Sequence, residues 1–307
     1  SFYLRFDIQN FSLLDDHYWD FEAISENKSK PVYYTINGST KTLESREGVK
    51  WYVDFSNDAK NLIQFVFDHL GSILPYSFEK HPQNDSNILE AYKQSTFDIS
   101  YITDDFTSQI LMDTPDFYGI ASFPGDFINL YHRGGNIFLA ASSLSEGKKG
   151  GNFCQTLIHE LGHALGLSHP HHKSQKTENS LTLMPGLSNP EDYGTYKSNQ
   201  ILYTAMSYAW DVFHPQSYDY GYPFTFMALD IAALQFLYGS NSNNTGNDTY
   251  YLTSTHSVDN NGLATDQGVN SMCIYDTSGT DTISAVGNNQ SVVINLNPAD
   301  LGNVQDN

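Results

Sequence analysis

The spacing of apolar side chains predicts both strands and helices over the first 240 residues. β-Branched and aromatic residues at 31–36 indicate a strand, and residues 97–102 alternate between apolar and polar side chains as a second strand would. Two more apolar runs, at 118–123 and 136–141, predict further strands. Between residues 58 and 74 the apolar positions recur at helical spacing, which predicts a helix at the surface of the protein.

Two further helices and an irregular start complete this region. Asn152 precedes an apolar segment and is expected to be the N-cap of a helix. Residues 228–237 show a second helical pattern, which we expect Gly239 to end. The segment 1–30 has no regular pattern, and we expect it to be irregular and held by four aromatic anchors: Phe11, Tyr18, Trp19 and Phe21.

The composition changes after Gly239. Residues 241–248 are polar, and a domain boundary is expected near 239–245. This gives one domain at 1–240 and a β-rich region at 241–307. In the latter we expect short strands around Tyr250, Ile274 and Ile283 and at 292–296. The predicted fold class is an α+β domain, with long helices on a mixed twisted sheet, followed by a small all-β region.

One short segment carries the pattern H-E-x-x-H-x-x-G-x-x-H, from His159 to His169. Positions four residues apart share a face of a helix, so His159 and His163 can direct their imidazoles at one metal ion. Glu160 can reach a water that the metal activates without binding the metal itself. Gly166 lets the backbone leave the helix in a conformation that a side chain would disfavour, which brings in His169. Three protein ligands leave one coordination position open, as in catalytic zinc sites.

A bare H-E-x-x-H also arises by chance, and the alternative is a buried helix whose histidines hydrogen-bond in the core. The glycine and the third histidine argue against that alternative, because packing gives no reason to place three histidines around this glycine. Downstream, Met206 lies in the segment Thr204-Ala205-Met206-Ser207-Tyr208. A Met in an apolar segment is ordinarily core filler. Ser207 and Tyr208 favour instead the methionine turn that follows the extended zinc motif in metzincins.

Four stretches make the chain resemble one family of metzincins, the serralysins, which are secreted bacterial metalloproteases. They are the zinc helix with Ser168-His169-Pro170, the methionine turn 205–208, and the segments 229–239 (LDIAALQFLYG) and 275–283 (YDTSGTDTI). Pro170 and Tyr208 separate serralysins from the matrixin branch. The resemblance runs from about residue 30 onward, and its strong motifs lie between residues 151 and 283.

The resemblance implies roles for individual residues. Tyr208 is implied to be an extra zinc ligand at rest and a hydrogen-bond donor to the developing oxyanion, and Met206 to form an apolar floor under the histidines. The implied reaction is peptide-bond hydrolysis by water that zinc activates, with Glu160 as general base. The substrate is expected to lie along an edge strand, for which 136–139 is our candidate. A plain internal strand is the equal alternative.

Asp276 and Asp281 bracket a flexible turn in the β-rich region. Such a turn can offer oxygens to a calcium ion, or it can be an ordinary Asp-rich turn capped by its own side chains. The resemblance favours calcium and implies as ligands Thr245, Asn247, Thr249, Asp276, Ser278 and Asp281. The glycine-rich nonapeptide repeats that build a β-roll are absent from the sequence, so we expect a truncated roll or sandwich without repeat-bound calcium.

The remaining histidines and the cysteines suggest no second site. The histidines expected to be exposed polar side chains are His132, His171, His172 and His214, and those without a motif are His81 and His256. Cys154 and Cys273 are too few for a disulfide framework, and both are expected to be buried free thiols.

The chain of 307 residues is strongly acidic: 35 Asp and Glu against 15 Lys and Arg give a formal net charge of -20. This balance argues against nucleic acid or an anionic membrane as partner. It suits a soluble secreted protein that binds a hard cation, or it serves solubility alone. No apolar stretch is long enough to span a membrane. The chain starts at Ser1 without the features of a signal peptide, so we interpret it as a processed form.

The sequence therefore predicts a secreted, extracellular, zinc-dependent endopeptidase with zinc and calcium as cofactors. Expected partners are protein or peptide substrates, with a protein inhibitor as an open alternative, and the chain is expected to be a monomer. Two other functions stay open: a catalytically inactive binding or toxin component of the same fold, and a zinc hydrolase of small amides. Intact Glu160 and three intact histidines speak against an inactive relative.

Overall fold

The computed structural model describes residues 18–37, 52–84, 86–103, 118–125, 133–141, 144, 147–171, 184–195, 197–209, 221–242, 245–252, 271–287, 292, 294 and 296. The strands in these ranges are β1 (Val32–Asn37), β2 (Phe78–Lys80), β3 (Phe97–Ile102), β4 (Gly119–Ala121), β5 (Asn136–Ala140), β6 (Thr249–Tyr251) and β7 (Thr282–Ser284). The helices are α1 (Phe21–Ile24), α2 (Asn57–Ile73), α3 (Ile88–Gln94), α5 (Asn152–Ala164) and α6 (Ala228–Tyr238).

The first five strands form one sheet in the order β2-β1-β3-β5-β4. The sequence predicted a mixed sheet but not this strand order. The strands β1, β2, β3 and β5 are parallel, and β4 runs antiparallel to β5. Every residue of β3 and β5 is buried, so both faces of the sheet centre are covered. Because β5 lies between β3 and β4, our expectation that 136–139 is an edge strand is wrong. Among the described strands, β4 is the edge strand next to β5.

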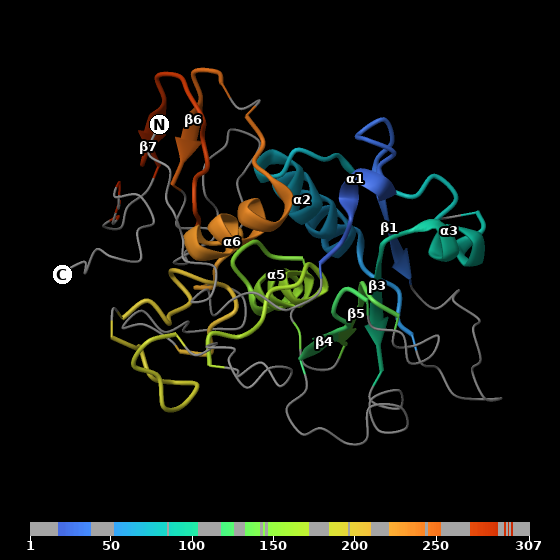
Figure 1. Cartoon of the computed structure of the whole chain (residues 1–307), viewed down its shortest axis with the longest axis horizontal. Coiled ribbons are helices and arrows are strands. Elements are labelled where there is room, and N and C mark those ends of the chain that lie inside the picture. The colour runs from blue at the N-terminus through green and yellow to red at the C-terminus, as the bar shows by residue number, and fades with distance from the viewer. Residues whose placement is uncertain are drawn as a thin grey trace.

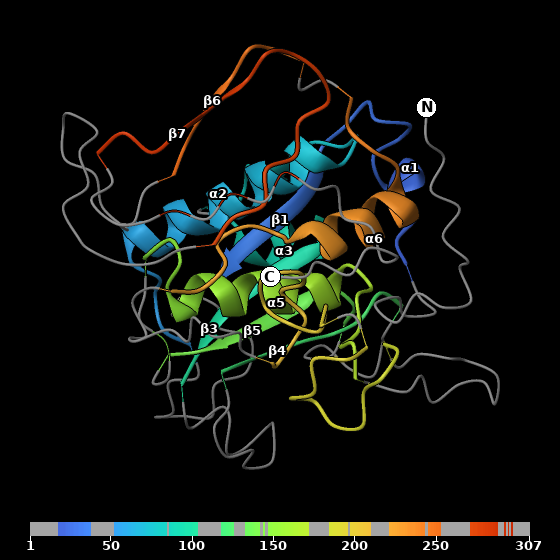
Figure 2. The same cartoon turned by 90° about the vertical axis from the view of Figure 1, so that its left-hand side faces the viewer.

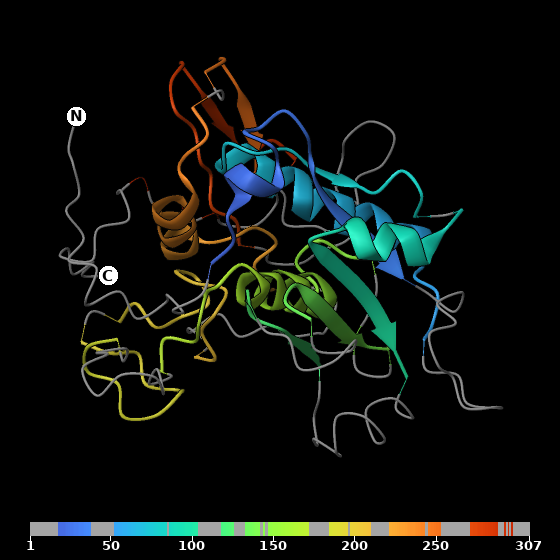
Figure 3. The same ribbon diagram turned by 45° about the vertical axis from the view of Figure 1, so that its right-hand side comes forward.

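Two long helices cover one side of the sheet. Figures 2 and 3 show α2 and α5 next to each other on this side, and α2 contacts α5 while α5 contacts β4 and β5. The short helix α3 lies on the other side and contacts β1 (Figure 1). The core between α2, α5 and the sheet is apolar and aromatic, with Tyr34 stacked on Phe67 at a centroid distance of 3.9 Å. This packing holds α5, the helix with the zinc motif, in a fixed position on the sheet.

Helix boundaries follow local signals in the sequence. The side chain of Ser56 accepts a hydrogen bond from the N–H of Ala59 and caps α2, which confirms the helix predicted at 58–74. Gly239 ends α6 with a φ of +82°, as expected. The N-cap of α5 is Gly151 and carries no side-chain bond, so the prediction that Asn152 is the cap is off by one residue.

The N-terminal segment packs on the end of α5. The indole N–H of Trp19 donates to the carbonyl of Ala164 at 2.7 Å, and the buried ring of Phe21 contacts Tyr238. These two aromatic anchors are confirmed. Tyr18 is 63% exposed, so its expected anchoring role is wrong, and Phe11 lies outside the described residues. The sequence also failed to indicate α1, β2 and α3.

The C-terminal region forms a separate two-stranded sheet, seen above α6 in Figure 1. β6 and β7 pair in parallel with Thr249 opposite Thr282. The strand expected around Ile274 is absent, since residues 272–277 are irregular. Of the strand expected at 292–296, residues 293 and 295 lie outside the described part of the chain. The hydroxyl of Tyr275 donates to the carbonyl of Asn241 at 2.9 Å and ties this region to the chain after α6. The domain boundary near 239–245 stays a prediction.

Candidate metal centre

The helix α5 presents two histidines of the motif on one face. His159 and His163 are both buried, at 6% and 7% exposure. The Nδ1 atom of His159 lies 2.8 Å from the carbonyl oxygen of Ala205, and the Nδ1 atom of His163 lies 2.7 Å from that of Leu167. A carbonyl oxygen only accepts, so each Nδ1 carries the proton. Each Nε2 is therefore the nitrogen whose lone pair can bind a metal.

The turn after α5 brings in the third histidine. Gly166 has a φ of +92°, the left-handed conformation that the sequence predicted for it. The N–H of Gly166 donates to the carbonyl of His163, and the N–H of Leu167 donates to that of Gly162, which is the Schellman arrangement at a helix end. His169 then folds back, and its Nε2 lies 2.9 Å from that of His159 and 3.0 Å from that of His163.

These three nitrogens fit a zinc ion. They lie within 4.8 Å of one another. Tetrahedral zinc with Zn–N distances of about 2.0–2.1 Å separates its nitrogen ligands by about 3.3 Å. Three lone pairs that face each other at such short range repel unless a proton or a cation lies between them. The protonated Nδ1 atoms leave the Nε2 atoms as acceptors, so the donor set is that of a three-histidine metal site.

Glu160 lies beside the histidines and is buried, at 6% exposure. Burial raises the pKa of its carboxyl to about 8. Strand β4 approaches it closely: a Cβ atom on Gly119 would lie 2.8 Å from Cγ and 3.0 Å from Oε1 of Glu160. The ring of Phe123, just after β4, contacts His163 at a centroid distance of 5.1 Å. Our sequence analysis missed Gly119 and Phe123, and only the glycine at the start of a short strand could have indicated either.

Tyr208 lies over the histidine cluster. Its ring centroid is 5.6 Å from that of His159 and 4.6 Å from that of His169, and the residue is 48% exposed. The ring of His171 stacks on His169 at 5.0 Å and contacts Tyr208 at 4.9 Å. His171 is only partly exposed, so the expectation of a fully exposed polar side chain is wrong. His132, His172, His214 and His256 lie outside the described residues, whereas His81, for which we found no motif, is buried beside Tyr33.

Met206 packs beneath the zinc helix. It is fully buried, and a Cβ atom on Gly162 would lie 2.5 Å from its Sδ. The methionine turn is held by Asp230 of α6, which accepts hydrogen bonds from the hydroxyl of Thr204 and the N–H of Ala205. Sequence analysis assigned no role to Asp230, although it lies in the segment 229–239 that carries part of the resemblance.

The two loops expected to bind calcium meet at the start of β6 and β7. The N–H of Asp248 donates to Asp281 at 2.9 Å, and the N–H of Thr280 donates to the side chain of Asn247 at 2.8 Å. A Cβ atom on Gly279 would lie 1.8 Å from the carbonyl oxygen of Gly246. Carboxylate oxygens that could hold one ion come from Asp248, Asp276 and Asp281. Asp248 was not among the expected ligands, although an acid between Asn247 and Thr249 is visible in the sequence.

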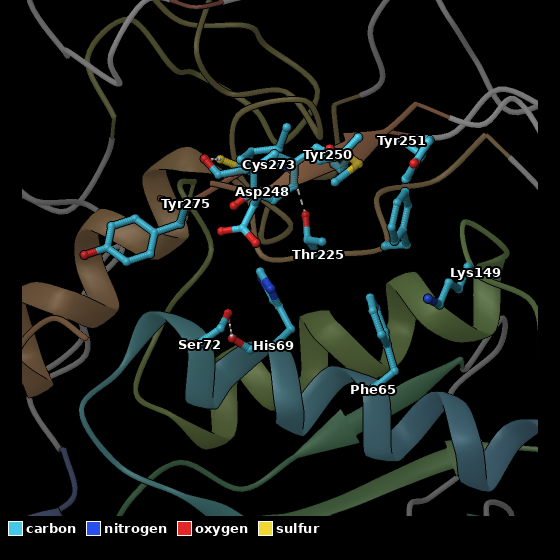
Figure 4. A pocket seen from close by; sticks show the side chains of 14 residues that line it. Phe65, His69, Ser72, Lys149, Thr225, Asp248, Tyr250, Tyr251, Cys273 and Tyr275 are labelled. Carbon is cyan, nitrogen blue, oxygen red and sulfur yellow. Dashed lines mark hydrogen bonds between the residues drawn. The ribbon is translucent and has the colours of Figure 1, made fainter. Parts of the chain in front are cut away.

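The two cysteines are free thiols, and one cavity lies apart from the histidines. Both cysteines are free, as expected, and Cys154 is buried. Cys273 is only partly buried, so the expectation that it is buried is wrong. A cavity of about 480 Å³ lies between α2 and the C-terminal region, where the imidazole of His69 points into it (Figure 4). Burial lowers the pKa of His69 to about 4. None of the residues of the zinc motif lines this cavity. No helix in the described ranges is both long enough and apolar enough to cross a membrane.

Known proteins with similar sequences are named serralysin or metallopeptidase. No family model matches the chain. The serralysin of Proteus mirabilis is 32% identical over 157 residues, which are 50% of this chain and 30% of that protein. The serralysin of Photorhabdus luminescens is 33% identical over 153 residues, or 49% of this chain and 30% of that protein.

A third relative carries a name that states its activity. The metallopeptidase AprA of Pseudomonas marginalis is 32% identical over 155 residues, or 49% of this chain and 31% of that protein. The matched part of the chain thus spans about three tenths of the length of these curated relatives. This similarity, which covers about half of the chain, supports membership of the serralysin family.

Proposed function

We propose that this chain is a zinc-dependent endopeptidase that hydrolyses peptide bonds in proteins. The observation that carries the proposal is the convergence of three histidine Nε2 atoms, each within hydrogen-bonding distance of another, next to the buried carboxyl of Glu160. The similarity to proteins named serralysin and metallopeptidase supports it. A buried structural zinc site would have four protein ligands, whereas this cluster offers three imidazoles and a half-exposed tyrosine.

The three histidines would hold zinc through Nε2. The bound ion supplies a Lewis acid that polarises the scissile carbonyl and makes water more acidic. Glu160 takes the proton from the attacking water and delivers it to the leaving amine. Because Glu160 is buried beside the histidines, bulk water is kept away from the proton that it transfers. Gly119 leaves room for the carboxylate, because any side chain at that position would occupy the same space.

Tyr208 would donate a hydrogen bond to the oxyanion that forms when water attacks. Partial burial raises the pKa of its phenol to about 12, so the hydroxyl carries its proton at neutral pH. The ring lies against His159 and His169, and its 48% exposure gives it room to move. Its role as an extra zinc ligand at rest is part of the same proposal. Met206 serves as the apolar support below the histidines.

The substrate would pair with β4, the edge strand nearest to Glu160. The carbonyl of Tyr118 and the N–H of Ser122 bond to β5, and Ile120 lies opposite Phe138. In an antiparallel pair, alternate residues direct their N–H and C=O groups at the partner strand. Tyr118, Ile120 and Ser122 face β5 in this way, so the N–H and C=O groups of Gly119 and Ala121 point away from β5. An extended peptide can add to such an edge by main-chain hydrogen bonds. A peptide bound in this way would lie beside Glu160, the proposed general base.

We further propose that calcium binds where the loops before β6 and β7 meet. The expected backbone oxygens of Thr245, Asn247 and Thr249 and the ligands Asp276, Ser278 and Asp281 lie in these two loops. The proximity of three carboxylates supports the proposal, since like charges at this range repel without a cation. Asp248 joins the ligand set. The ion would fix the register of β6 against β7.

The cellular setting follows from the family resemblance. We propose that the protein acts outside the cell, as a single chain, on protein or peptide substrates. A catalytically inactive relative and a zinc hydrolase of small amides are the competing functions. Intact Glu160 and three intact histidines speak against an inactive relative. The position of β4 at the edge of the sheet, among the described strands, favours an extended peptide over a small amide as substrate.

The experiment that tests this function compares the wild-type chain with Glu160→Ala. Both proteins are loaded with zinc, and the metal content and the cleavage of unfolded casein are measured. We expect equal zinc content and loss of cleavage in the variant. Casein cleavage that survives the substitution would contradict the proposed base. Turnover of short acyl amides without casein cleavage by the wild type would favour the small-amide hydrolase.

A further inference from the structure

Asp230, in the first turn of α6, connects this helix to the methionine turn. Its carboxylate is fully buried. Oδ2 accepts the N–H of Ala205 at 2.7 Å and the N–H of Met227 at 3.0 Å, and Oδ1 accepts the hydroxyl of Thr204 at 2.5 Å. Burial raises the pKa of the carboxyl to about 6, while these three donors oppose the rise. All three donors to the carboxylate thus come from two short segments, the methionine turn and the residue that precedes α6.

The bonds of Asp230 fix the two peptide groups on either side of Ala205. The peptide before Ala205 is held directly, through its N–H. The peptide after Ala205 is held through Thr204, whose hydroxyl oxygen accepts the N–H of Met206 at 3.1 Å while its proton goes to Asp230. The carbonyl of this second peptide is the group that accepts the Nδ1 proton of His159 at 2.8 Å. An unbroken series of hydrogen bonds therefore runs from Asp230 to the histidine.

We propose that Asp230 is a positioning residue for the metal centre, which orients His159 through Thr204 and the peptide between Ala205 and Met206. The inference rests on the proposed zinc site, but not on its catalytic activity. An outer carbonyl or carboxylate that holds the second nitrogen of a ligating histidine fixes its tautomer and its ring orientation. Here the carbonyl is itself held by a buried carboxylate. The same bonds keep Met206 under the zinc helix.

His163 provides an internal comparison. Its Nδ1 donates to the carbonyl of Leu167, in the turn that follows α5, and no hydrogen bond links that turn to Asp230 in the described part of the chain. A change at Asp230 should therefore loosen His159 and leave His163 as it was. General loss of stability would affect the two histidines alike. This asymmetry separates positioning from a purely structural role.

The test uses the whole chain and zinc ions alone. We measure the zinc dissociation constant, by competition with a chromogenic chelator, for Asp230→Ala, Asp230→Asn and Thr204→Val. Asp230→Ala should weaken zinc binding by about tenfold, the lower end of the range for residues that support metal ligands. Asp230→Asn keeps an oxygen that can accept both N–H groups, so it should restore most of the affinity. Thr204→Val removes both bonds of the threonine hydroxyl, the one donated to Asp230 and the one accepted from the N–H of Met206, and leaves the N–H of Ala205 bonded to Asp230. It should therefore weaken binding less than Asp230→Ala does, by about threefold.

The matched control is Asp98→Ala in β3. Asp98 is also fully buried and accepts the hydroxyl of Thr35 at 2.6 Å, but it lies in the sheet and not in the hydrogen bonds that reach the histidines. This variant should lose stability and keep the zinc dissociation constant. In NMR spectra of the zinc form, Thr204→Val should speed the exchange of the Nδ1 proton of His159 and leave that of His163 unchanged.

Unchanged zinc affinity in both Asp230→Ala and Thr204→Val would overturn the inference, and so would equal acceleration of the two histidine protons. If Asp230→Ala does not fold, Thr204→Val decides alone. A wild-type chain that binds zinc but cleaves no protein would sink the proposed function and leave this inference standing.

Discussion

A Cβ atom placed on Gly119 would lie 2.8 Å from Cγ of Glu160, closer than two carbon atoms approach in folded proteins. The edge strand β4 and the zinc helix α5 are therefore in contact through a glycine and the candidate general base. The contact couples the two parts of the proposed reaction, because the strand that would align the substrate also limits the position of the carboxylate. Thr156, one turn before Glu160, would meet the same Cβ atom at 2.9 Å.

Gly119→Ala should lower kcat strongly while zinc stays bound. The new methyl group pushes the carboxylate or the strand, and a displacement of about 1 Å in an active site can cost about 100-fold in rate. The measurement is kcat on a peptide substrate with zinc content determined in parallel. Gly71→Ala in α2 is the matched control, since a Cβ there has only an ordinary contact of 3.5 Å with the carbonyl of Tyr76. Wild-type kcat in Gly119→Ala would show that the base is elsewhere.

Tyr208→Phe should lower kcat much more than it changes KM. Loss of one hydrogen-bond donor to an oxyanion costs about 10²–10³ in kcat. Zinc should remain, because the three histidines are intact. Steady-state kinetics on a peptide substrate give both constants, and Tyr251→Phe, exposed in β6, serves as the control. Equal kcat values for Tyr208→Phe and the wild type would remove the tyrosine from the transition state.

Gly162→Ala sets two opposing effects against each other. Alanine is favoured over glycine within a helix by about 1 kcal/mol. A Cβ atom here would lie 2.5 Å from Sδ of the fully buried Met206, and overpacking of a core costs about 1–3 kcal/mol. We expect the steric cost to win, so the free energy of unfolding in urea should fall. Gly71→Ala, which has room, should be neutral or stabilising.

A double substitution at Gly162 and Met206 tests whether their collision causes the loss of stability. Met206→Ala should destabilise the Gly162→Ala protein less than it destabilises the wild type, because the shorter side chain relieves the collision. Additive losses would mean that Gly162 and Met206 do not interact as the structure indicates.

Calcium should raise the melting temperature of the zinc-loaded protein. A ligand at 100 times its dissociation constant stabilises a folded protein by about 2.7 kcal/mol. The shift should disappear in Asp276→Asn and in Asp281→Asn, and it should persist in Glu79→Gln, an exposed acid on β2. Thermal unfolding with a chelator that spares zinc, followed by added calcium, gives the shift. An unchanged melting temperature on calcium addition would exclude the site between the two loops.

The cluster of three histidines could be predicted from the sequence because it depends on local geometry. His159 and His163 are four residues apart on one helix, and Gly166 controls the turn that returns His169, so a short segment specifies the cluster. The strands at 31–36 and 97–102 and the helix at 58–74 were visible for a similar reason: their apolar positions repeat with the period of the element.

What the sequence did not predict depends on contacts between distant segments. The internal position of β5 follows from sheet order, and apolar strands at the edge and in the centre of a sheet look alike. The contact of Gly119 with Glu160 joins residues of β4 and α5, and the bonds of Asp230 join α6 to the methionine turn. The sequence could not show that His171 is partly buried, because its burial depends on the stacking of its ring on His169. Short elements such as α1 and β2 carry too few residues to show a period.

The central claim is that His159, His163 and His169 together bind a catalytic zinc ion. The most direct measurement is elemental analysis of freshly purified chain that cleaves casein, repeated after dialysis against a zinc chelator and after zinc is restored. We predict about one zinc per chain, loss of cleavage with loss of the metal, and recovery on addition of zinc, as a three-histidine catalytic site requires. Material that cleaves casein fully while it contains no transition metal would contradict the account.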